Sequence, residues 1–291
     1  MVAVNEARAQ LDCAIFPIPE SARVEEFDDK CAFNAFCVEN GIDAPAAMTL
    51  AHKQTEPFEG LVARLGLPFV VKPTSKTGGE GYRLIRSSQD FDVGVRCDDA
   101  YGYSPLAAQE FVEGEDVDIS VLAVAGEILH IAVQRNSGGI VTFIHDETAV
   151  AMARKLVRAS NFSGLLHLDG RRDPHGGKIK LVEANPRGWG SMKAATWCGL
   201  DFISAGVAVA LGQKSTQPVS IEAGSYPGFP RLLAELAAEP RRWSRLDSRQ
   251  RGLIRTRLTA ASYIASRLMT VLQRAWGCLP ALRARVAKAP P

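Results

Sequence analysis

The residues best suited to chemistry lie in LLHLDGRRDPHGGKIKLVEANPR, residues 165–187. Two β-rich runs flank the turn sequence DPHGG, and this pattern predicts an antiparallel hairpin. A turn centred near Gly176 places Asp169 opposite Glu183, and strand alternation puts Asn185 on the same face as Glu183. Facing carboxylates repel each other unless a cation lies between them, and carboxylate and amide oxygens suit Mg²⁺ or Mn²⁺. We therefore predict a metal site at Asp169, Glu183 and Asn185; the alternative is a solvent-facing hairpin with hydrated charges.

The histidines do not indicate a zinc site, because none of the five stands in HxxxH or HxxE spacing. His167 lies on the same face as Asp169 by alternation. We expect it to be a neighbour of the carboxylates.

A glycine-rich segment, TSKTGGEG (residues 74–81), stands between the strand-like runs PFVVKP and YRLIR. Its spacing matches neither a Walker A loop nor GxGxxG. Three glycines can nevertheless bring backbone N–H groups onto phosphate oxygens without steric cost: Gly78, Gly79 and Gly81. Lys72, in the preceding strand, would add a positive charge. The alternative is a plain turn, and Lys30, near the start of a helix, is similarly either a phosphate contact or a solvated side chain.

The segment QEFVEGEDVDIS (residues 109–120) could bind a nucleoside. A strand ending at Glu110, Phe111 and Val112 offers backbone groups to an adenine edge, and Glu115 could bind ribose hydroxyls. The alternative is an edge strand followed by an acidic loop.

The elements that must position these residues indicate α+β layers with largely antiparallel sheets. Hydrophobic periodicity predicts helices at 29–40, 58–65, 147–159 and 201–211, with another after Gly190. A brief strand is expected in DCAIFPIP (residues 12–19). Residues 213–230, rich in Gly, Pro and Ser, suggest a linker, and helices are expected at 231–239 and 249–276.

The composition, with 46% hydrophobic and 23% charged residues, is that of a globular protein and excludes a collagen or a disordered chain. No apolar run reaches about 18 residues, and the first residues do not resemble a secretory signal. Six cysteines without CxxC spacing indicate reduced thiols. We expect a cytoplasmic protein.

The C-terminal region is strongly basic. Residues 231–291 hold thirteen Arg or Lys and three acidic residues, a net charge of +10, which leaves −8 for residues 1–230. Apolar residues recur at helical spacing from Ile254 to Leu272. This helix either packs on the acidic body or contacts a membrane surface or anionic partner through residues 249–276. Nucleic acid binding is not expected, because no reading motif accompanies the charge.

Four segments occur in a fixed order: DDKCAFNAFCVENGIDAP, LPFVVKPTSKTGGEG, AAQEFVEGEDVDIS and GLLHLDG…KLVEANPRGWGS. This series resembles the ATP-grasp superfamily, on the carbamoyl phosphate synthetase and carboxylate–amine ligase side. The resemblance runs from about residue 28 to 212 and implies ATP clamped between two α+β subdomains.

By that resemblance, phosphates would be contacted by Lys30, Lys72 and the loop of Gly78, Gly79 and Gly81. The adenine hinge would be Glu110, Phe111 and Val112, and the ribose residue would be Glu115. Magnesium (or Mn²⁺) would be bound by Asp169, Glu183 and Asn185. Arg187 would be catalytic, stabilising transferred charge, and Arg135 would lie on the substrate side.

The resemblance implies a ligase that phosphorylates a small-molecule carboxylate, after which an amine attacks the acyl phosphate. Members carry a larger N-terminal domain, so residues 1–27 are expected to be its remnant, residues 28–212 the ATP-grasp domain, residues 213–230 a linker and residues 231–291 a basic helical region. Three interpretations follow: a truncated or minimal enzyme, one half of a two-chain enzyme, or an ATP-binding module without catalysis.

Overall fold

The computed structural model describes residues 2–76, 78–174 and 177–260. The chain divides into two compact units, Met1–Gly228 and Phe229–Pro291. The candidate site lies entirely within the first unit, which contains two sheets.

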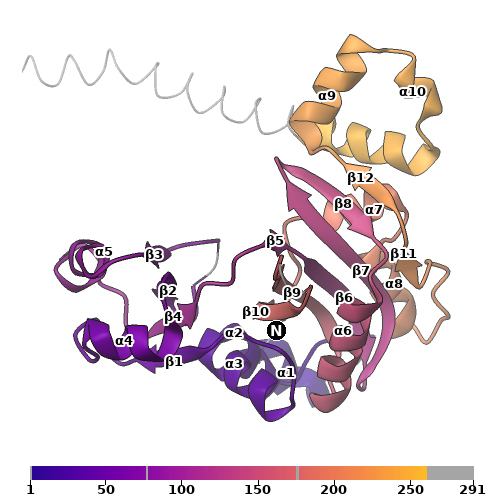
Figure 1. Ribbon diagram of the computed structural model, residues 1–291. Helices are drawn as coiled ribbons and strands as arrows, with labels where there is room; N and C mark the ends of the chain where they lie inside the picture. Colours follow the sequence, from indigo (N-terminus) through magenta and orange to yellow (C-terminus); the bar gives the residue numbers. More distant parts are fainter. Residues whose placement is uncertain (1, 77, 175–176, 261–291) are drawn as a thin grey trace, which may run out of the picture. The chain divides into compact units, whose positions relative to one another are not determined.

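The smaller sheet has the strand order β1-β4-β2-β3 and is antiparallel throughout. Its strands are β1 (Ala47–Leu50), β2 (Phe69–Pro73), β3 (Arg83–Ile85) and β4 (Leu106–Glu110). The helices α4 (Phe58–Leu65) and α5 (Ser88–Phe91) and the π-helical turn η2 (Asp92–Arg96) complete this lobe (Figure 1). Buried aromatic and aliphatic residues form its own core, which includes Phe69, Phe91 and Tyr101.

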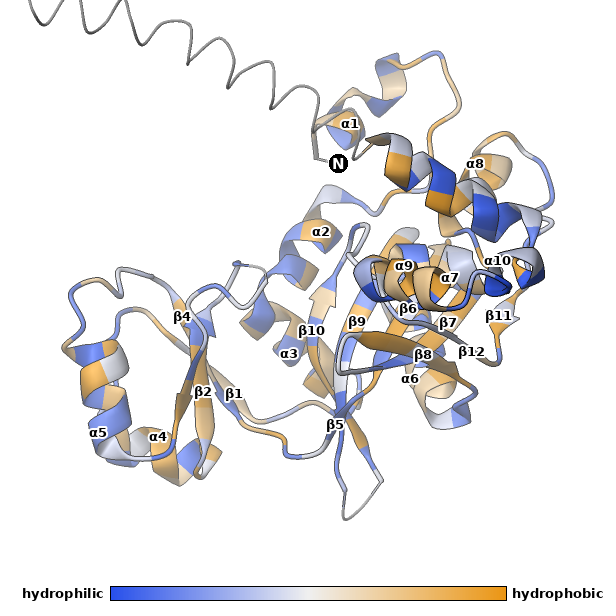
Figure 2. Cartoon of the chain, turned by 90° about the horizontal axis from the view of Figure 1, so that it is seen from above, coloured by the Kyte–Doolittle hydropathy of each residue, from blue (hydrophilic) through white to orange (hydrophobic). Residues whose placement is uncertain are grey.

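The larger sheet has the order β10-β9-β6-β7-β8-β12, with β5 added on β9 and β11 added on β7. Its strands are β5 (Glu115–Asp116), β6 (Asp118–Val124), β7 (Glu127–Ser137), β8 (Ile140–Ile144), β9 (Gly164–Arg172), β10 (Ile179–Asn185), β11 (Ser220–Ile221) and β12 (Gly224–Tyr226). Hydrophobic residues are concentrated along the strands of both sheets (Figure 2).

Helices cover both faces of the larger sheet. One face packs against α2 (Ser21–Asp28), α3 (Lys30–Glu39) and α6 (Glu147–Ala159), in a core that contains Phe27, Phe33 and Leu156. The opposite face packs against α7 (Met192–Cys198) and α8 (Phe202–Ala210), in a core that contains Trp189 and Phe202. Alternation along β6 directs Ile119, Val121 and Ala123 to the first core and Leu122 to the second.

Several helices begin and end where the sequence predicted. The side chain of Asp29 accepts hydrogen bonds from the backbone N–H groups of Cys31 and Ala32, and so caps α3. Asp146 caps α6 in the same way, through the N–H of Ala149. The bounds of α4 and α6 coincide with the predicted ranges, 58–65 and 147–159.

Two sequence predictions differ from the structure. Residues 11–20 form no strand; this segment follows α1 (Val2–Ala7) and the 3₁₀ turn η1 (Arg8–Gln10), and its prolines lack the N–H donor that a strand ladder requires. Residues 213–230 are more than a linker, because they contain β11, which pairs in parallel with β7, and β12, which pairs with β8.

The second unit contains α9 (Phe229–Ala238), α10 (Arg242–Arg245) and helical residues 248–260. The predicted helix 249–276 is therefore helical as far as residue 260, and residues 261–276 lie outside the described residues. Throughout the described part of the chain, no helix combines the length and apolar character needed to cross a membrane.

Candidate functional site

A cavity of about 480 Å³ is lined by residues of both sheets, within the usual size range of small-molecule sites. The small sheet contributes residues from β2 and β4, and the large sheet contributes residues from β5, β6, β7, β9 and β10. The lining comprises Val70, Lys72, Gly79, Tyr82, Gln109, Glu110, Phe111, Val112, Asp116, Asp118, Asn136, Asp169, Gly170, Arg171 and Val182. A cavity of about 600 Å³ near α2 is larger, but none of the predicted site residues lines it. The smaller cavity is therefore the candidate site.

The predicted adenine hinge lines this cavity. Glu110 joins the two sheets, because its Oε1 accepts a hydrogen bond from Lys180 Nζ at 2.6 Å and its Oε2 accepts one from the backbone N–H of Ala46 at 3.0 Å. The guanidinium of Arg171 lies 5.4 Å from the ring centroid of Phe111, a cation–π geometry. Arg171 Nε also donates to the carbonyl of Val112 at 2.6 Å. The hinge is thus held by β9 and β10 as well as by its own strand.

Glu115, predicted as the ribose residue, does not line the cavity. Its Oε2 lies 3.2 Å from Nη1 of Arg135, whose Nε is buried without a hydrogen-bond partner among the described residues. Adjacent side chains on a strand point to opposite faces, and the neighbouring Asp116 is the carboxylate that lines the cavity. The oxygen of Asp116 also accepts a hydrogen bond from Arg171 at 2.6 Å.

Both predicted lysines converge on Glu183. Lys30 Nζ lies 3.6 Å and Lys72 Nζ lies 3.9 Å from Glu183 Oε2. Lys30 Nζ also donates to the carbonyl of Lys76 at 2.6 Å, which links α3 to the start of the glycine-rich loop. Burial lowers the pKa of Lys72, and the charge of Lys30 lowers it further, whereas Glu183 opposes this shift. Burial raises the pKa of Glu183, and the two lysines counteract that rise.

The glycine-rich loop adopts backbone conformations that favour glycine. Gly78, Gly79 and Gly81 have φ of +68°, +76° and +70°. A Cβ at Gly81 would lie 2.7 Å from Pro73 Cδ, whereas open space surrounds the Cβ positions at Gly78 and Gly79. Of the three, Gly79 lines the cavity.

The predicted hairpin register is confirmed at the site. Asp169 pairs with Glu183, and His167 pairs with Asn185. Nearer the turn the register differs by one residue, because a bulge lies between Leu181 and Glu183. The bulge turns Glu183 and Asn185 away from the core that buries Leu181, and towards the face that carries Asp169.

Asn185 connects Asp169 to Arg187. Its Nδ2 donates to Asp169 Oδ2 at 3.1 Å, and its Oδ1 accepts from Arg187 Nη2 at 2.6 Å. Asp169, Asn185 and Arg187 therefore form one hydrogen-bonded chain. Glu183 lies beside it, on the same strand as Asn185 and opposite Asp169. Arg187 Nη1 also donates to the carbonyl of Gly188 at 3.3 Å.

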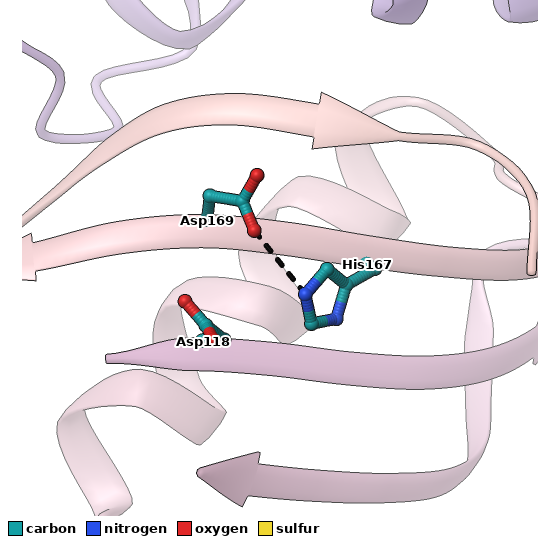
Figure 3. A group of neighbouring side chains, drawn as sticks. All are labelled: Asp118, His167 and Asp169. Atoms are coloured by element: carbon teal, nitrogen blue, oxygen red, sulfur yellow. Dashed lines mark ion pairs between the residues drawn. The ribbon is translucent and has the colours of Figure 1, made fainter. Parts of the chain in front are cut away.

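Sequence reasoning missed one carboxylate of the site, Asp118. One ligand atom each of Asp118, His167 and Asp169 lie within 4.8 Å of one another (Figure 3). His167 Nε2 lies 3.2 Å from Asp169 Oδ1. Burial raises the pKa of Asp118 to about 6, and the neighbouring charge of Asp169 raises it in the same direction. Asp118 stands on β6, and only the pairing of β6 with β9 brings it to the hairpin.

The residues present fit a nucleotide and Mg²⁺. Lys72 lines the cavity and Lys30 does not, but both buried ammonium groups lie within 4 Å of Glu183, the only carboxylate that both contact among the described residues. Asp169 and Glu183 supply hard oxygen ligands on adjacent strands, as Mg²⁺ requires. Asn185 could add its Oδ1 where the hydrogen bond from Arg187 is shared or released.

Comparison with known proteins agrees with this geometry. A family model described as "ATP-grasp in the biosynthetic pathway with Ter operon" matches residues 103–225. Carboxyaminoimidazole ribonucleotide synthase from Aspergillus clavatus, solved as a complex with ATP, superposes with a TM-score of 0.61 at 18% identity, over 76% of this chain and 60% of that one. The chain has the ATP-grasp fold, and its sequence is similar to ATP-grasp proteins over residues 103–225. The larger sheet, the small antiparallel lobe and the cavity lined by both are the parts of the ATP-grasp fold present here.

Two curated proteins are similar to this chain in sequence. D-alanine–D-alanine ligase of Coprothermobacter proteolyticus is 26% identical over 103 residues, 35% of this chain and 33% of the relative. The large chain of carbamoyl phosphate synthase from Deinococcus radiodurans is 27% identical over 185 residues, 56% of this chain and 17% of the relative. The chain thus spans a third or less of the length of these two relatives.

Proposed function

We propose that this protein is an ATP- and Mg²⁺-dependent ligase that activates a carboxylate as an acyl phosphate for attack by an amine. One observation carries the proposal: Lys30 and Lys72 converge on Glu183, directly across the hairpin from Asp169 and beside a cavity lined by the hinge. Cations and carboxylates at such short range are what phosphoryl transfer requires, because that reaction depends on positioning and charge neutralisation.

In the proposed reaction, the ammonium groups of Lys30 and Lys72 would bind the phosphates of ATP. In the protein alone, Lys30 and Lys72 neutralise the partly buried carboxylate of Glu183. Glu183 would hold Mg²⁺ when Mg·ATP is bound, and Lys30 and Lys72 would then be free to contact phosphate oxygens. Mg²⁺ then supplies charge neutralisation at the transferred phosphoryl group. The exchange costs little, because every buried charge keeps an opposite charge beside it throughout.

Other residues would hold the nucleotide and the acceptor. Phe111 and Val112 present the hinge backbone to the base, and Asp116 replaces Glu115 as the carboxylate available to the ribose. Arg187, fixed by its hydrogen bond to Asn185, carries a permanent charge next to the metal ligands and would stabilise the developing oxyanion when the amine attacks.

The proposed carboxylate and amine chemistry draws support from the relatives. D-alanine–D-alanine ligase, by its name, joins two amino acids.

The test is a coupled assay for ADP release with pooled small carboxylates and amines, in the presence of Mg·ATP. We expect ADP and phosphate to form only when both substrates are present. Glu183→Ala should lower the rate more than tenfold, and Asp173→Ala, in the hairpin turn, serves as a control for a carboxylate change nearby. A rate that falls less than tenfold in Glu183→Ala would contradict the proposed role. ATP binding without turnover under all conditions, also with a candidate partner chain added, would instead favour a non-catalytic nucleotide-binding module.

A further inference from the structure

Three side chains on one face of the large sheet form a cluster that the ligase chemistry above does not use as a unit. Asp118 comes from β6, and His167 and Asp169 come from β9 (Figure 3). Their ligand atoms lie within 4.8 Å of one another. For comparison, ligands of an octahedral ion with bonds of about 2.1 Å lie about 3.0 Å apart when adjacent and about 4.2 Å apart when opposite. The 3.2 Å between His167 Nε2 and Asp169 Oδ1 corresponds to an adjacent pair.

Each of the three residues is held by a neighbour through its other polar atom. Ser120 Oγ lies 2.9 Å from Nδ1 of His167. Gln134 Nε2 donates to Asp118 Oδ2 at 3.2 Å, and Asn185 Nδ2 donates to Asp169 Oδ2 at 3.1 Å. Such outer partners are typical of metal ligands, since they fix the imidazole tautomer and orient the carboxylates.

The imidazole ring is also fixed in orientation. It is 7% exposed and stacks on Trp189, with ring centroids 5.2 Å apart and planes 8° from parallel. When Nδ1 donates its proton to Ser120, the lone pair of Nε2 points at Asp169. One lone pair and two carboxylates then face one another, and a cation is what such an arrangement binds.

We propose that Asp118, His167 and Asp169 bind a divalent transition-metal ion in the absence of nucleotide. An imidazole among the ligands favours Mn²⁺, Co²⁺ or Zn²⁺ over Mg²⁺. This site overlaps the nucleotide magnesium site proposed above at Asp169, but it uses Asp118 and His167 in place of Glu183 and Asn185. Since Asp118 and Asp169 line the cavity, the ion would face whatever occupies it.

The test uses Mn²⁺ alone as the probe, because Mn²⁺ avoids the thiols that would bind Zn²⁺. Tag-free full-length protein is titrated without nucleotide, and free Mn²⁺ is followed by its electron paramagnetic resonance signal. We expect one saturable ion per chain, and Mg²⁺ should displace it only at more than tenfold higher concentration. Asp118→Asn and His167→Phe should each weaken binding at least tenfold; the first keeps the acceptor for Gln134, and the second keeps a flat ring against Trp189.

Two matched variants separate this site from its neighbours. Glu183→Ala should leave Mn²⁺ affinity within about threefold of wild type, and so should Asp116→Asn, which removes an exposed carboxylate from the same cavity. Melting curves in EDTA show whether each variant is folded. If His167→Phe does not fold, the Mn²⁺ affinity of Asp118→Asn alone tests the proposal.

The proposal is wrong if wild type binds no ion saturably, or if Asp118→Asn and His167→Phe both retain wild-type affinity. It is also wrong if Glu183→Ala abolishes binding while Asp118→Asn does not, because the ion then belongs to the nucleotide site. In that last case the proposed ligase function still stands. If the wild-type protein instead binds Mn²⁺ but does not bind ATP, the proposed ligase function is wrong and this metal site remains.

Discussion

Replacing Asp118 by Asn should stabilise the metal-free protein above pH 7 and have little effect near pH 4. Burial and the charge of Asp169 raise the pKa of Asp118 from 3.8 to about 6. The folded state therefore holds this proton more tightly than the unfolded state does. The resulting stabilisation is fully present below about pH 4 and is lost as the pH rises through about 6.

The size of the effect follows from the same values. A rise in pKa from 3.8 to about 6 corresponds to about 3 kcal/mol against the charged form, and relaxation around the carboxylate reduces this to about 1–3 kcal/mol. For a unit of this length, each kcal/mol shifts the melting temperature by roughly 2–4 °C. Asn avoids the cost because it stays neutral, and its Oδ1 can still accept the hydrogen bond from Gln134.

The assay is thermal melting in EDTA at pH 4, 6 and 8, with Asp116→Asn as a control that removes the same charge at an exposed position. We expect Asp118→Asn to melt several degrees above wild type at pH 8 and level with it at pH 4. An equal gain at every pH, or no gain at pH 8, would refute the electrostatic reasoning.

The remaining predictions concern the metal, the buried lysine and the loop. Adding Mn²⁺ at about 100 times its dissociation constant should stabilise wild type by about 2.7 kcal/mol and Asp118→Asn much less. The difference in melting temperature between the two proteins at pH 8 should therefore shrink or change sign. Lys72→Met should leave the stability of the unliganded protein within about 1 kcal/mol, because burial already lowers the pKa of this lysine, but should weaken Mg·ATP binding at least tenfold in a calorimetric titration. Gly81→Ala should cost about 1–3 kcal/mol in a chemical unfolding experiment, since φ is +70° and the new Cβ would lie 2.7 Å from Pro73 Cδ; Gly78→Ala, with φ of +68° and open space around its Cβ, should cost less.

Local sequence signals were sufficient for much of the fold. The N-capping carboxylates Asp29 and Asp146 stand directly before amphipathic runs, so the starts of α3 and α6 could be predicted. The turn sequence DPHGG predicted the hairpin, and the predicted pairing of Asp169 with Glu183 holds because the bulge between Leu181 and Glu183 offsets a one-residue difference in register nearer the turn. Both signals depend only on residues close together in the chain.

Long-range pairing and short irregular elements could not be predicted in the same way. Asp118 meets His167 only because β6 pairs with β9, and nothing near either residue in the sequence specifies that pairing. The bulge before Glu183 depends on a shift of one residue, and so does the fact that Asp116 lines the cavity whereas Glu115 does not. Strand alternation alone does not resolve such a shift. Strands as short as β11 and β12 carry too few residues to show a period of two.

The roles assigned by resemblance to the phosphate and metal residues remain predictions. The structure places Lys30, Lys72 and Glu183 in contact, and it brings Asp169, Asn185 and Arg187 into one hydrogen-bonded chain. These contacts support the predicted site, and ligand binding must test it.

The most direct measurement is a thermal melt of the full-length protein with and without Mg·ATP, beside Glu183→Ala. A ligand at about 100 times its dissociation constant should stabilise the fold by about 2.7 kcal/mol, a rise of several degrees. We predict a magnesium-dependent rise in wild type that is lost in Glu183→Ala. No rise in a folded wild type, or an equal rise in both proteins, would contradict the assignment of this cavity and of the neighbouring Glu183 to Mg·ATP.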